Sequence, residues 1–243
     1  MALRQILKIT TYGNTDRGHL RTDNEDSLLV DDRHRLYAVA DGLGGLPSGS
    51  KASTLAMDLL AKAIKGSPEL DDFNLETCLL SINTQVEEEG RRISKDLGIG
   101  TTLTVIHIVD STMSLAHVGD SGLYLSREGV CHKLTVDHTM AQEMLDRLKP
   151  EDDPYIPDYY HHTLTRCIGQ LSDLVIDTGE YTLQSGDRLL LYTDGITKML
   201  EEDEIHQAIN HAKSARNLVN QIIREANDRG GPDNSTAIAI FVD

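Results

Sequence analysis

Short apolar runs bounded by polar, turn-forming residues recur along this chain, and they predict β-strands that come in groups. The predicted strands cover residues 6–11, 27–30, 36–40, 101–109, 113–118, 123–127, 130–135, 175–183, 187–192 and 236–242. Several of them, including 36–40 and 237–242, are apolar on both faces. Sheets built from such strands need cover on both sides.

Apolar residues at helical spacing predict two helices between the first and second strand groups and two more before the last strand. The first follows Ser50, the expected N-cap, and its pattern covers residues 52–64, while the second covers 75–93. The last two cover 205–212 and 218–226. Strands in runs with helices in pairs differ from βαβ alternation, so the predicted class is α+β. We expect a four-layer α/β/β/α sandwich with two central antiparallel sheets and helices on both outer faces.

A single domain over residues 1–243 is expected, because no internal repeat and no Pro/Gly/Ser-rich linker divides the sequence. Residues 138–163 form a polar, irregular stretch that contains Pro150, Pro154 and Pro157. We predict that this stretch is a flap-like insertion at the surface of the domain.

Composition narrows the possible partners. The net charge of −16 would repel nucleic-acid phosphates, so no nucleic-acid partner is expected. No apolar segment approaches the roughly 20 residues of a membrane span, and the charge-punctuated start does not resemble a signal peptide. The widely spaced Cys78, Cys131 and Cys167 are interpreted as free thiols in a reducing compartment. These features predict a cytoplasmic monomer with no membrane partner.

Five aspartates lie where predicted strands end or begin, and they are Asp26, Asp41, Asp120, Asp194 and Asp233. If folding brings these strand ends together, the carboxylates form a site made only of oxygen atoms. Such a site suits a hard divalent cation, Mg²⁺ or Mn²⁺, rather than zinc. Asp-Gly, which occurs at positions 41 and 194, is also typical of hairpin turns. The dipeptide alone therefore leaves both interpretations open.

Longer strings around these aspartates recur together and in order, and they lie at residues 16–26, 39–45, 100–102, 118–121, 134–139, 164–166, 193–195 and 233–236. Together they resemble the metal-dependent serine/threonine protein phosphatases of the phosphatase 2C type, in their short bacterial form. The resemblance extends over essentially the whole chain, and the combination is specific although no single string is. The α/β/β/α sandwich of that family agrees with the fold expected above.

The resemblance implies a metal centre in the cleft between the sheets, with two Mg²⁺ or Mn²⁺ ions. Asp41 would bridge the two ions, and Gly42 would add its carbonyl oxygen to one of them. Asp194 and Asp233 would bind the other ion. Asp120, together with Asp194, would hold a weaker third ion.

Four further residues match supporting positions of the family. Glu25 and Asp26 correspond to carboxylates that orient metal-bound waters, and Asn234 corresponds to a supporting site residue. Arg21 matches the arginine that grips the substrate phosphate, a role that its forked guanidinium suits. Without the resemblance, a surface ion pair between Arg21 and a neighbour such as Asp23 would be the favoured interpretation.

The resemblance implies an enzyme that hydrolyses phosphoserine and phosphothreonine in proteins, with Arg21, Asp41, Asp194 and Asp233 as the catalytic set. A water shared by two cations about 3.5–4 Å apart would attack the phosphorus. From family habit, the partners would be a eukaryotic-like serine/threonine kinase, which the enzyme would counteract, and that kinase's substrates. One alternative is a non-catalytic member that binds phosphoproteins. Another, a two-metal phosphodiesterase, would need a basic groove, which the net charge contradicts.

Two positions and one longer stretch depart from the family pattern. Bacterial members usually carry a histidine five residues beyond the bridging aspartate, as a candidate proton donor to the leaving group, and this chain has Leu46 there. Gly122 stands where many relatives have arginine, and residues 140–162 match poorly. The choice of substrate is therefore the part of the resemblance that transfers least well.

The histidines near residues 140–162 give weaker indications. His138 lies in a family-like string and is interpreted as structural. His161 and His162 are adjacent, and adjacent residues on a strand face opposite ways. A metal site made by these two histidines is therefore disfavoured, and we expect them to face solvent.

Overall fold

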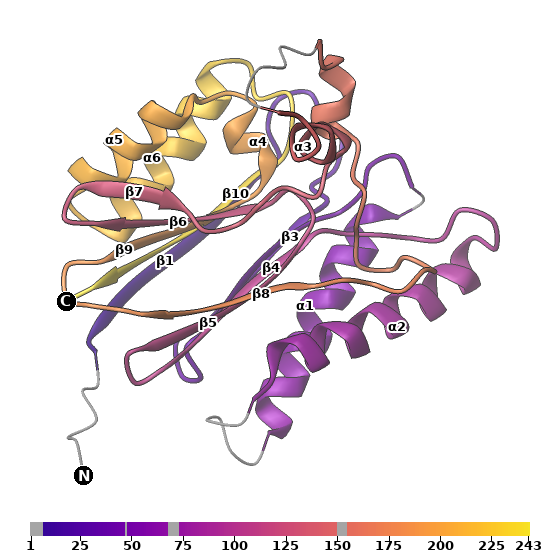
Figure 1. Ribbon diagram of the computed structural model, residues 1–243, viewed down its shortest axis with the longest axis horizontal. Helices are drawn as coiled ribbons and strands as arrows, with labels where there is room; N and C mark the ends of the chain where they lie inside the picture. Colours follow the sequence, from indigo (N-terminus) through magenta and orange to yellow (C-terminus); the bar gives the residue numbers. More distant parts are fainter. Residues whose placement is uncertain (1–6, 47, 68–72, 150–154) are drawn as a thin grey trace.

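The computed structural model describes residues 7–46, 48–67, 73–149 and 155–243. Two five-stranded sheets pack against each other, and helices cover the outer face of each sheet (Figure 1). Every pairing between neighbouring strands is antiparallel. The predicted α+β class and the four-layer sandwich are therefore confirmed.

The first sheet has the strand order β1-β10-β9-β6-β7, and the second has the order β2-β3-β4-β5-β8. The strands of the first sheet are β1 (Ile9–Asp16), β6 (Gly122–Arg127), β7 (Val130–Lys133), β9 (Arg188–Tyr192) and β10 (Ser235–Val242). Those of the second are β2 (Asp26–Asp31), β3 (Leu36–Asp41), β4 (Leu103–Val109), β5 (Thr112–Val118) and β8 (Asp177–Thr182). Because β10 lies between β1 and β9, it brings residues from both ends of the sequence together.

Two pairs of helices cover the sheets, and they are α1 (Gly49–Gly66), α2 (Leu75–Ile93), α5 (Glu202–His211) and α6 (Ala215–Asp228). The first pair packs on the second sheet through residues such as Leu60 and Ile82. The second pair packs on the first sheet through residues such as Leu218. A third apolar cluster, which includes Tyr37 and Ile238, fills the space between the sheets. Three buried layers therefore separate the four layers of secondary structure.

Some boundaries differ from the sequence-based expectation. β1 continues to Asp16 instead of ending at residue 11, because each residue as far as Asp16 pairs with β10; residue 6 lies outside the described residues. The N-cap of α1 is Ser48 rather than Ser50. Ser48 has a left-handed main chain, with φ of 61°, and its side chain makes no cap hydrogen bond, so the usual N-cap signal was misleading.

The predicted flap contains more regular structure than expected. It carries the short helix α3 (Met140–Leu145) and the 3₁₀ helix η2 (Asp158–His162). Thr139 begins α3 as its N-cap, with a side chain that accepts a hydrogen bond from the Gln142 amide at 3.2 Å. Pro150 and Pro154 lie outside the described residues.

One end of the sandwich collects the strand ends that were expected to form a site. Asp26 and Asp41 lie opposite each other in the β2–β3 ladder, and Asp16 lies opposite Ser235 in the β1–β10 ladder. The helix α4 (Asp194–Thr197) follows β9 at this end, near α3 (Figure 1). At the other end of β1 and β10, the Asp243 amide donates to the Lys8 carbonyl at 2.8 Å. Among the described helices, none is long and apolar enough to cross a membrane.

Candidate metal centre

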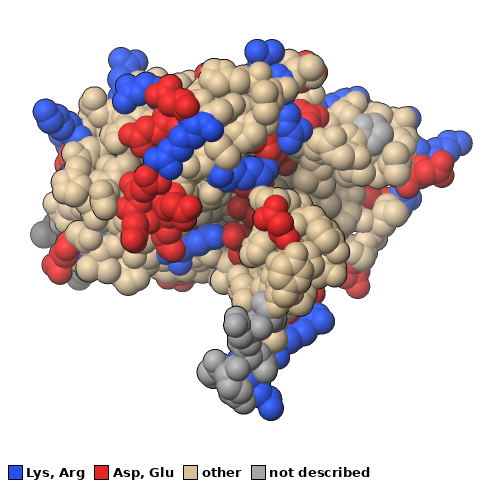
Figure 2. Space-filling model, turned by 90° about the horizontal axis from the view of Figure 1, so that it is seen from above, with Lys and Arg blue, Asp and Glu red and all other residues tan. Residues whose placement is uncertain are grey.

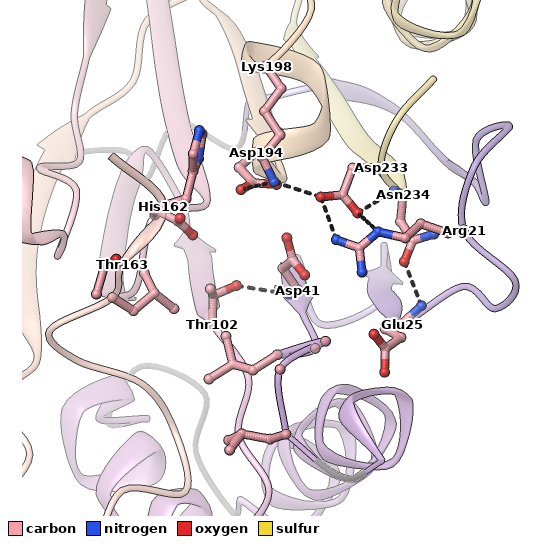
Figure 3. A pocket seen from close by; sticks show the side chains of 17 residues that line it. Arg21, Glu25, Asp41, Thr102, His162, Thr163, Asp194, Lys198, Asp233 and Asn234 are labelled. Carbon is pink, nitrogen blue, oxygen red and sulfur yellow. Dashed lines mark hydrogen bonds and ion pairs between the residues drawn. The ribbon is translucent and has the colours of Figure 1, made fainter. Parts of the chain in front are cut away.

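A cleft of about 520 Å³ opens where these strand ends meet. Its lining includes every predicted metal ligand together with Arg21, namely Arg21, Asp41, Gly42, Asp120, Asp194 and Asp233. Figure 3 shows that the carboxylates of Asp41, Asp194 and Asp233 point toward one another across the cleft. The structure thus brings together residues that are far apart in the sequence.

The main chain of Asp41 is fixed by two threonines. Its amide donates to the Thr102 hydroxyl at 2.8 Å, and its carbonyl accepts from the Thr102 amide and the Thr101 hydroxyl, both at 2.8 Å. The Thr102 hydroxyl also contacts the Ser121 hydroxyl at 2.7 Å. The residue next to Ser121 is Asp120. Hydrogen bonds among residues 100–102 and 118–121 therefore help to position both Asp41 and Asp120 at the cleft. The carboxylate of Asp41 is left free to point into it.

Neither Asp-Gly dipeptide forms a hairpin turn. A Cβ at Gly42 would lie 2.4 Å from the carbonyl of Gly49, and a Cβ at Gly195 would lie 1.8 Å from the carbonyl oxygen of Asn234. Both glycines therefore allow two main-chain segments to come closer than any side chain permits. This close approach places the preceding aspartate at the cleft, so the turn interpretation of these dipeptides is wrong.

Asp233 contacts two basic side chains. Arg21 Nε lies 2.9 Å from Asp233 Oδ1, and Arg21 Nη2 donates to Asp233 Oδ2 at 3.0 Å. Lys198 Nζ lies 2.6 Å from Asp233 Oδ2 and 2.6 Å from Asp194 Oδ2 (Figure 3). Arg21 therefore pairs with a residue of the cleft rather than with Asp23.

Burial and mutual repulsion change the pKa values of the carboxyl groups. Burial raises the pKa of Asp41 well above its ordinary range, and the nearby charges of Asp26 and Asp194 add to this effect. Burial, with repulsion from Asp194, raises the pKa of Asp120 to about 8. Burial alone would also raise the pKa of Asp233, but contacts with Lys198 and Arg21 lower it below its ordinary value. A bound cation would relieve the repulsion among these crowded acids.

Asp26 lies behind the cleft and is buried. Its Oδ2 accepts hydrogen bonds from the hydroxyls of Thr193 at 2.8 Å and Thr236 at 2.6 Å. Burial nevertheless raises the pKa of Asp26 to about 7, with further repulsion from Asp194. The hydroxyls of Thr193, which follows β9, and of Thr236, on β10, thus fix the carboxylate of Asp26.

Asn234 ties the segment after β1 to the residues before β10. Its Oδ1 accepts from the Glu25 amide at 2.8 Å, and its Nδ2 donates to the carbonyls of Arg17 and Asp23 at 2.9 and 3.0 Å. The Glu25 carbonyl accepts in turn from the Gly42 amide at 3.1 Å. A single buried amide therefore positions the segment that carries Arg21 and Glu25.

A network of hydrogen bonds and ion pairs around the buried His138 supports the main chain next to Asp120. The Gly119 amide donates to His138 Nδ1 at 3.1 Å, and His138 Nε2 lies 3.2 Å from Asp177 Oδ2. Arg166 Nη1 donates to Asp177 Oδ1 at 2.8 Å. These bonds agree with the structural role expected for His138, and they explain why the strings at 134–139 and 164–166 accompany the acidic ones.

The residues fit a hard divalent cation. Oδ1 of Asp26 and Oδ1 of Asp194 are buried without a hydrogen-bond partner among the described residues. The predicted donors are carboxylates and one carbonyl, which Mg²⁺ and Mn²⁺ prefer. Within the described ranges, however, no three His, Cys, Asp or Glu side chains are already gathered around one point that could hold an ion. Lys198 spans Asp194 and Asp233 instead.

The sequence did not reveal two residues of the cleft, Lys198 and His162. Lys198 was missed because α4 has only four residues, too few to show helical spacing. Its position four residues after Asp194 was the available signal, since residues i and i+4 share a helix face. His162 was expected to face solvent; it is exposed, but it also lines the cleft from η2.

Comparison with known proteins identifies the class to which this fold and this cleft belong. Residues 15–230 match the family described as protein phosphatase 2C. The chain is 33% identical over 234 residues to the serine/threonine phosphatase stp of Listeria monocytogenes, with 93% of each chain covered. It is also 33% identical over 235 residues to the protein phosphatase PhpP of Streptococcus pneumoniae, with 93% of this chain and 94% of that protein covered.

Among solved structures, the catalytic domain of the serine/threonine protein phosphatase PstP in complex with two manganese ions is similar, with a TM-score of 0.81 and 30% identity. That similarity covers 97% of this chain and 99% of the PstP chain. The chain therefore belongs to the protein phosphatase 2C family. It is an enzyme of the serine/threonine protein phosphatase class, as the motifs predicted, and the non-catalytic alternative is not supported.

Proposed function

We propose that the cleft hydrolyses phosphoserine and phosphothreonine in proteins with two divalent cations, Mg²⁺ or Mn²⁺, held by Asp41, Gly42, Asp194 and Asp233. The observation that supports this most directly is the convergence of Asp41, Asp194 and Asp233 on one cleft beside Arg21. The unpartnered Oδ1 of Asp194 adds a ligand atom that the fold leaves free. Asp120 with Asp194 is the proposed site of a weaker third cation.

When bound, two such cations neutralise the phosphoryl oxygens and lower the pKa of the attacking water. The protein's own residues bind and orient the substrate. Two of the five guanidinium N–H donors of Arg21 face Asp233, and the others remain for a phosphoryl oxygen. Glu25 and Asp26 are proposed to orient water molecules around the ions, and Asn234 to hold Glu25 in place.

The surface around the cleft is not uniformly acidic. Figure 2 shows Lys and Arg side chains interspersed among Asp and Glu on the face seen from above. A phosphorylated segment of a protein would therefore meet charges of both signs, in spite of the net charge of −16. The carboxylates that the cations would neutralise are four of the 39 acidic residues of the chain.

Substitution of the proposed ligands tests the function. Asp41→Asn and Asp194→Asn should each lower the Mn²⁺-dependent hydrolysis of p-nitrophenyl phosphate and of a phosphothreonine peptide by about 100-fold or more. EDTA should abolish the activity of the unaltered protein, and added Mn²⁺ should restore it. Asp58→Asn, on the exposed face of α1, removes the same charge far from the motifs and should change neither rate. Metal-independent turnover, or full activity of both ligand variants, would refute the proposal.

We further propose that the physiological substrates include a eukaryotic-like serine/threonine kinase and the proteins that it phosphorylates. The kinase comes from the family resemblance of the motifs, and the similarity to the phosphatases stp and PhpP supports a phosphoprotein substrate in general. The proposal also depends on the phosphatase activity proposed above. The Asp41→Asn variant and the unaltered phosphatase test this proposal. Co-expression of such a kinase with Asp41→Asn should leave the kinase phosphorylated, whereas co-expression with the unaltered phosphatase should not. Equal phosphorylation in both cultures would rule out that kinase as a substrate.

A further inference from the structure

Lys198 makes an unusual contact for a residue of a metal cleft. Its ammonium lies 2.6 Å from a carboxylate oxygen of Asp194 and 2.6 Å from one of Asp233. These two aspartates come from different segments, the start of α4 and the loop before β10. The Lys198 side chain is only 22% exposed, so solvent screens the two ion pairs weakly.

Lys198 contacts one oxygen of each of the two aspartates that a cation between Asp194 and Asp233 would share. On Asp233, Oδ2 accepts from Lys198 and Arg21, and Oδ1 contacts Arg21 and the Asn234 amide. Both oxygens of Asp233 are therefore already engaged by donors. On Asp194, Oδ2 contacts Lys198 and only Oδ1 is free. An ion could reach Asp194 Oδ1 directly, but at Asp233 Oδ2 it would compete with Lys198, and also with Arg21, which contacts the same oxygen.

We propose that Lys198 competes with a divalent cation for the carboxylates of Asp194 and Asp233. The competition has two consequences. The lysine weakens binding of the ion that these two aspartates share, because its charge repels the ion and because it occupies the ligand atoms. It also stabilises the protein before any ion binds, because one positive charge offsets the repulsion between the two carboxylates. The inference rests on the metal site of the proposed function.

Lys198→Met tests this, since methionine is unbranched and similar in length but carries no charge. Chelator-treated protein is titrated with Mn²⁺ by calorimetry, and its Tm is measured with and without Mn²⁺. We expect the Kd of Lys198→Met for Mn²⁺ to fall on the order of tenfold or more. Its Tm without metal should be lower than that of the unaltered protein, and its Tm gain on adding Mn²⁺ should be larger.

Two control variants accompany the test. Lys198→Arg keeps the charge and should bind Mn²⁺ with a Kd close to that of the unaltered protein. Lys8→Met removes a lysine that also faces an aspartate, Asp243, but at the far end of β1. It should leave the Kd and the Tm gain unchanged. If Lys198→Met does not fold without metal, Lys198→Gln provides the same loss of charge with a polar side chain.

Unchanged or weaker Mn²⁺ binding by Lys198→Met and Lys198→Gln would overturn the inference. Asp194→Asn in the same titration separates that outcome from failure of the metal site itself. If Asp194→Asn weakens Mn²⁺ binding while the Lys198 variants do not tighten it, only the role of Lys198 is wrong. If Asp194→Asn binds Mn²⁺ as tightly as the unaltered protein, the assigned metal site is wrong. Neither result depends on measuring phosphatase activity.

Discussion

At the scale of single residues, Leu46 occupies the position where the family pattern has a candidate proton donor to the leaving group. Leu46 lines the cleft with an apolar side chain. A seryl alkoxide leaves readily only if it receives a proton, whereas a phenolate hardly needs one. General-acid help of this kind is typically worth about 10²–10⁴-fold. Among the described residues that line the cleft, the histidine is His162, on η2.

Leu46→His should therefore act selectively on substrates with poor leaving groups. We expect kcat/KM for a phosphoserine peptide to rise by about tenfold relative to that for p-nitrophenyl phosphate, because only the first leaving group requires a proton. Both substrates are assayed with Mn²⁺ over a range of pH. Leu46→Asn, polar but unable to donate a proton as an acid, should give no selective gain. An equal change on both substrates after Leu46→His would argue against a missing donor.

At the scale of elements, long helices could be predicted from the sequence and short ones could not. The predicted boundaries 75–93 match α2, because apolar residues repeat over its whole length and Asn74 caps its first turn by accepting from the Thr77 amide at 2.7 Å. The four-residue α4 gives no such repeat. Gly195, its second residue, packs closely against the Asn234 carbonyl, which is a tertiary contact. The position of Lys198 could not be predicted for the same reason.

The segment between β1 and β2 offers a test at this scale. Asn234→Ala would leave the Glu25 amide and the carbonyls of Arg17 and Asp23 without their partner. An unsatisfied buried group costs about 1–3 kcal/mol, and these three groups are partly buried, so we expect the free energy of unfolding to fall by about 1–2 kcal/mol. Amide hydrogen exchange of residues 17–25 should accelerate.

Urea denaturation and exchange measurements check the Asn234→Ala prediction. Asn220→Ala, on the exposed face of α6, serves as the matched control and should not destabilise the protein. If Asn234→Ala unfolds at the same urea concentration as the unaltered protein and residues 17–25 exchange at the same rate, Asn234 does not hold this segment.

At the scale of the whole molecule, one buried histidine links stability to pH. His117 on β5 is fully buried and contacts the Thr104 hydroxyl at 2.9 Å and the Val136 carbonyl at 3.1 Å. Burial, and then the neighbouring His138, lowers the pKa of His117 from 6.5 to about 3. Between these values the unfolded chain binds a proton at this residue and the folded protein does not. Stability is therefore fully present above about pH 6.5 and is lost as the pH falls toward 3.

His117→Gln should reduce this pH dependence. In the unaltered protein His117 contributes up to about 1.4 kcal/mol of lost stability per pH unit within that window, since one extra proton binds to the unfolded state. Urea denaturation in EDTA at several pH values from 7 down to 4, for both proteins, gives the two slopes. The variant should show the shallower slope. Parallel slopes would mean that His117 is not neutral in the folded protein.

The four-layer arrangement was accessible from the sequence, but the contacts among the side chains of the cleft were not. Strands that are apolar on both faces require cover on both sides, and this requirement led to the four layers that are observed. The motifs placed Asp41, Asp194 and Asp233 at strand ends, and the strands carry them into one cleft. The ion pairs that these carboxylates form depend on basic side chains from distant parts of the sequence, such as Arg21 and Lys198, which both contact Asp233. A one-dimensional pattern does not encode those distances.

The pairing of Lys8 with Asp243 has a practical consequence. Both residues lie where β1 and β10 end, and the eight residues of β1 separate that end from the cleft by about 25 Å. A solid support, a fluorescent label or a second protein joined at Asp243 would therefore stay on the side remote from the opening. Immobilised in this way, the enzyme would keep its cleft accessible to macromolecules as well as to small substrates.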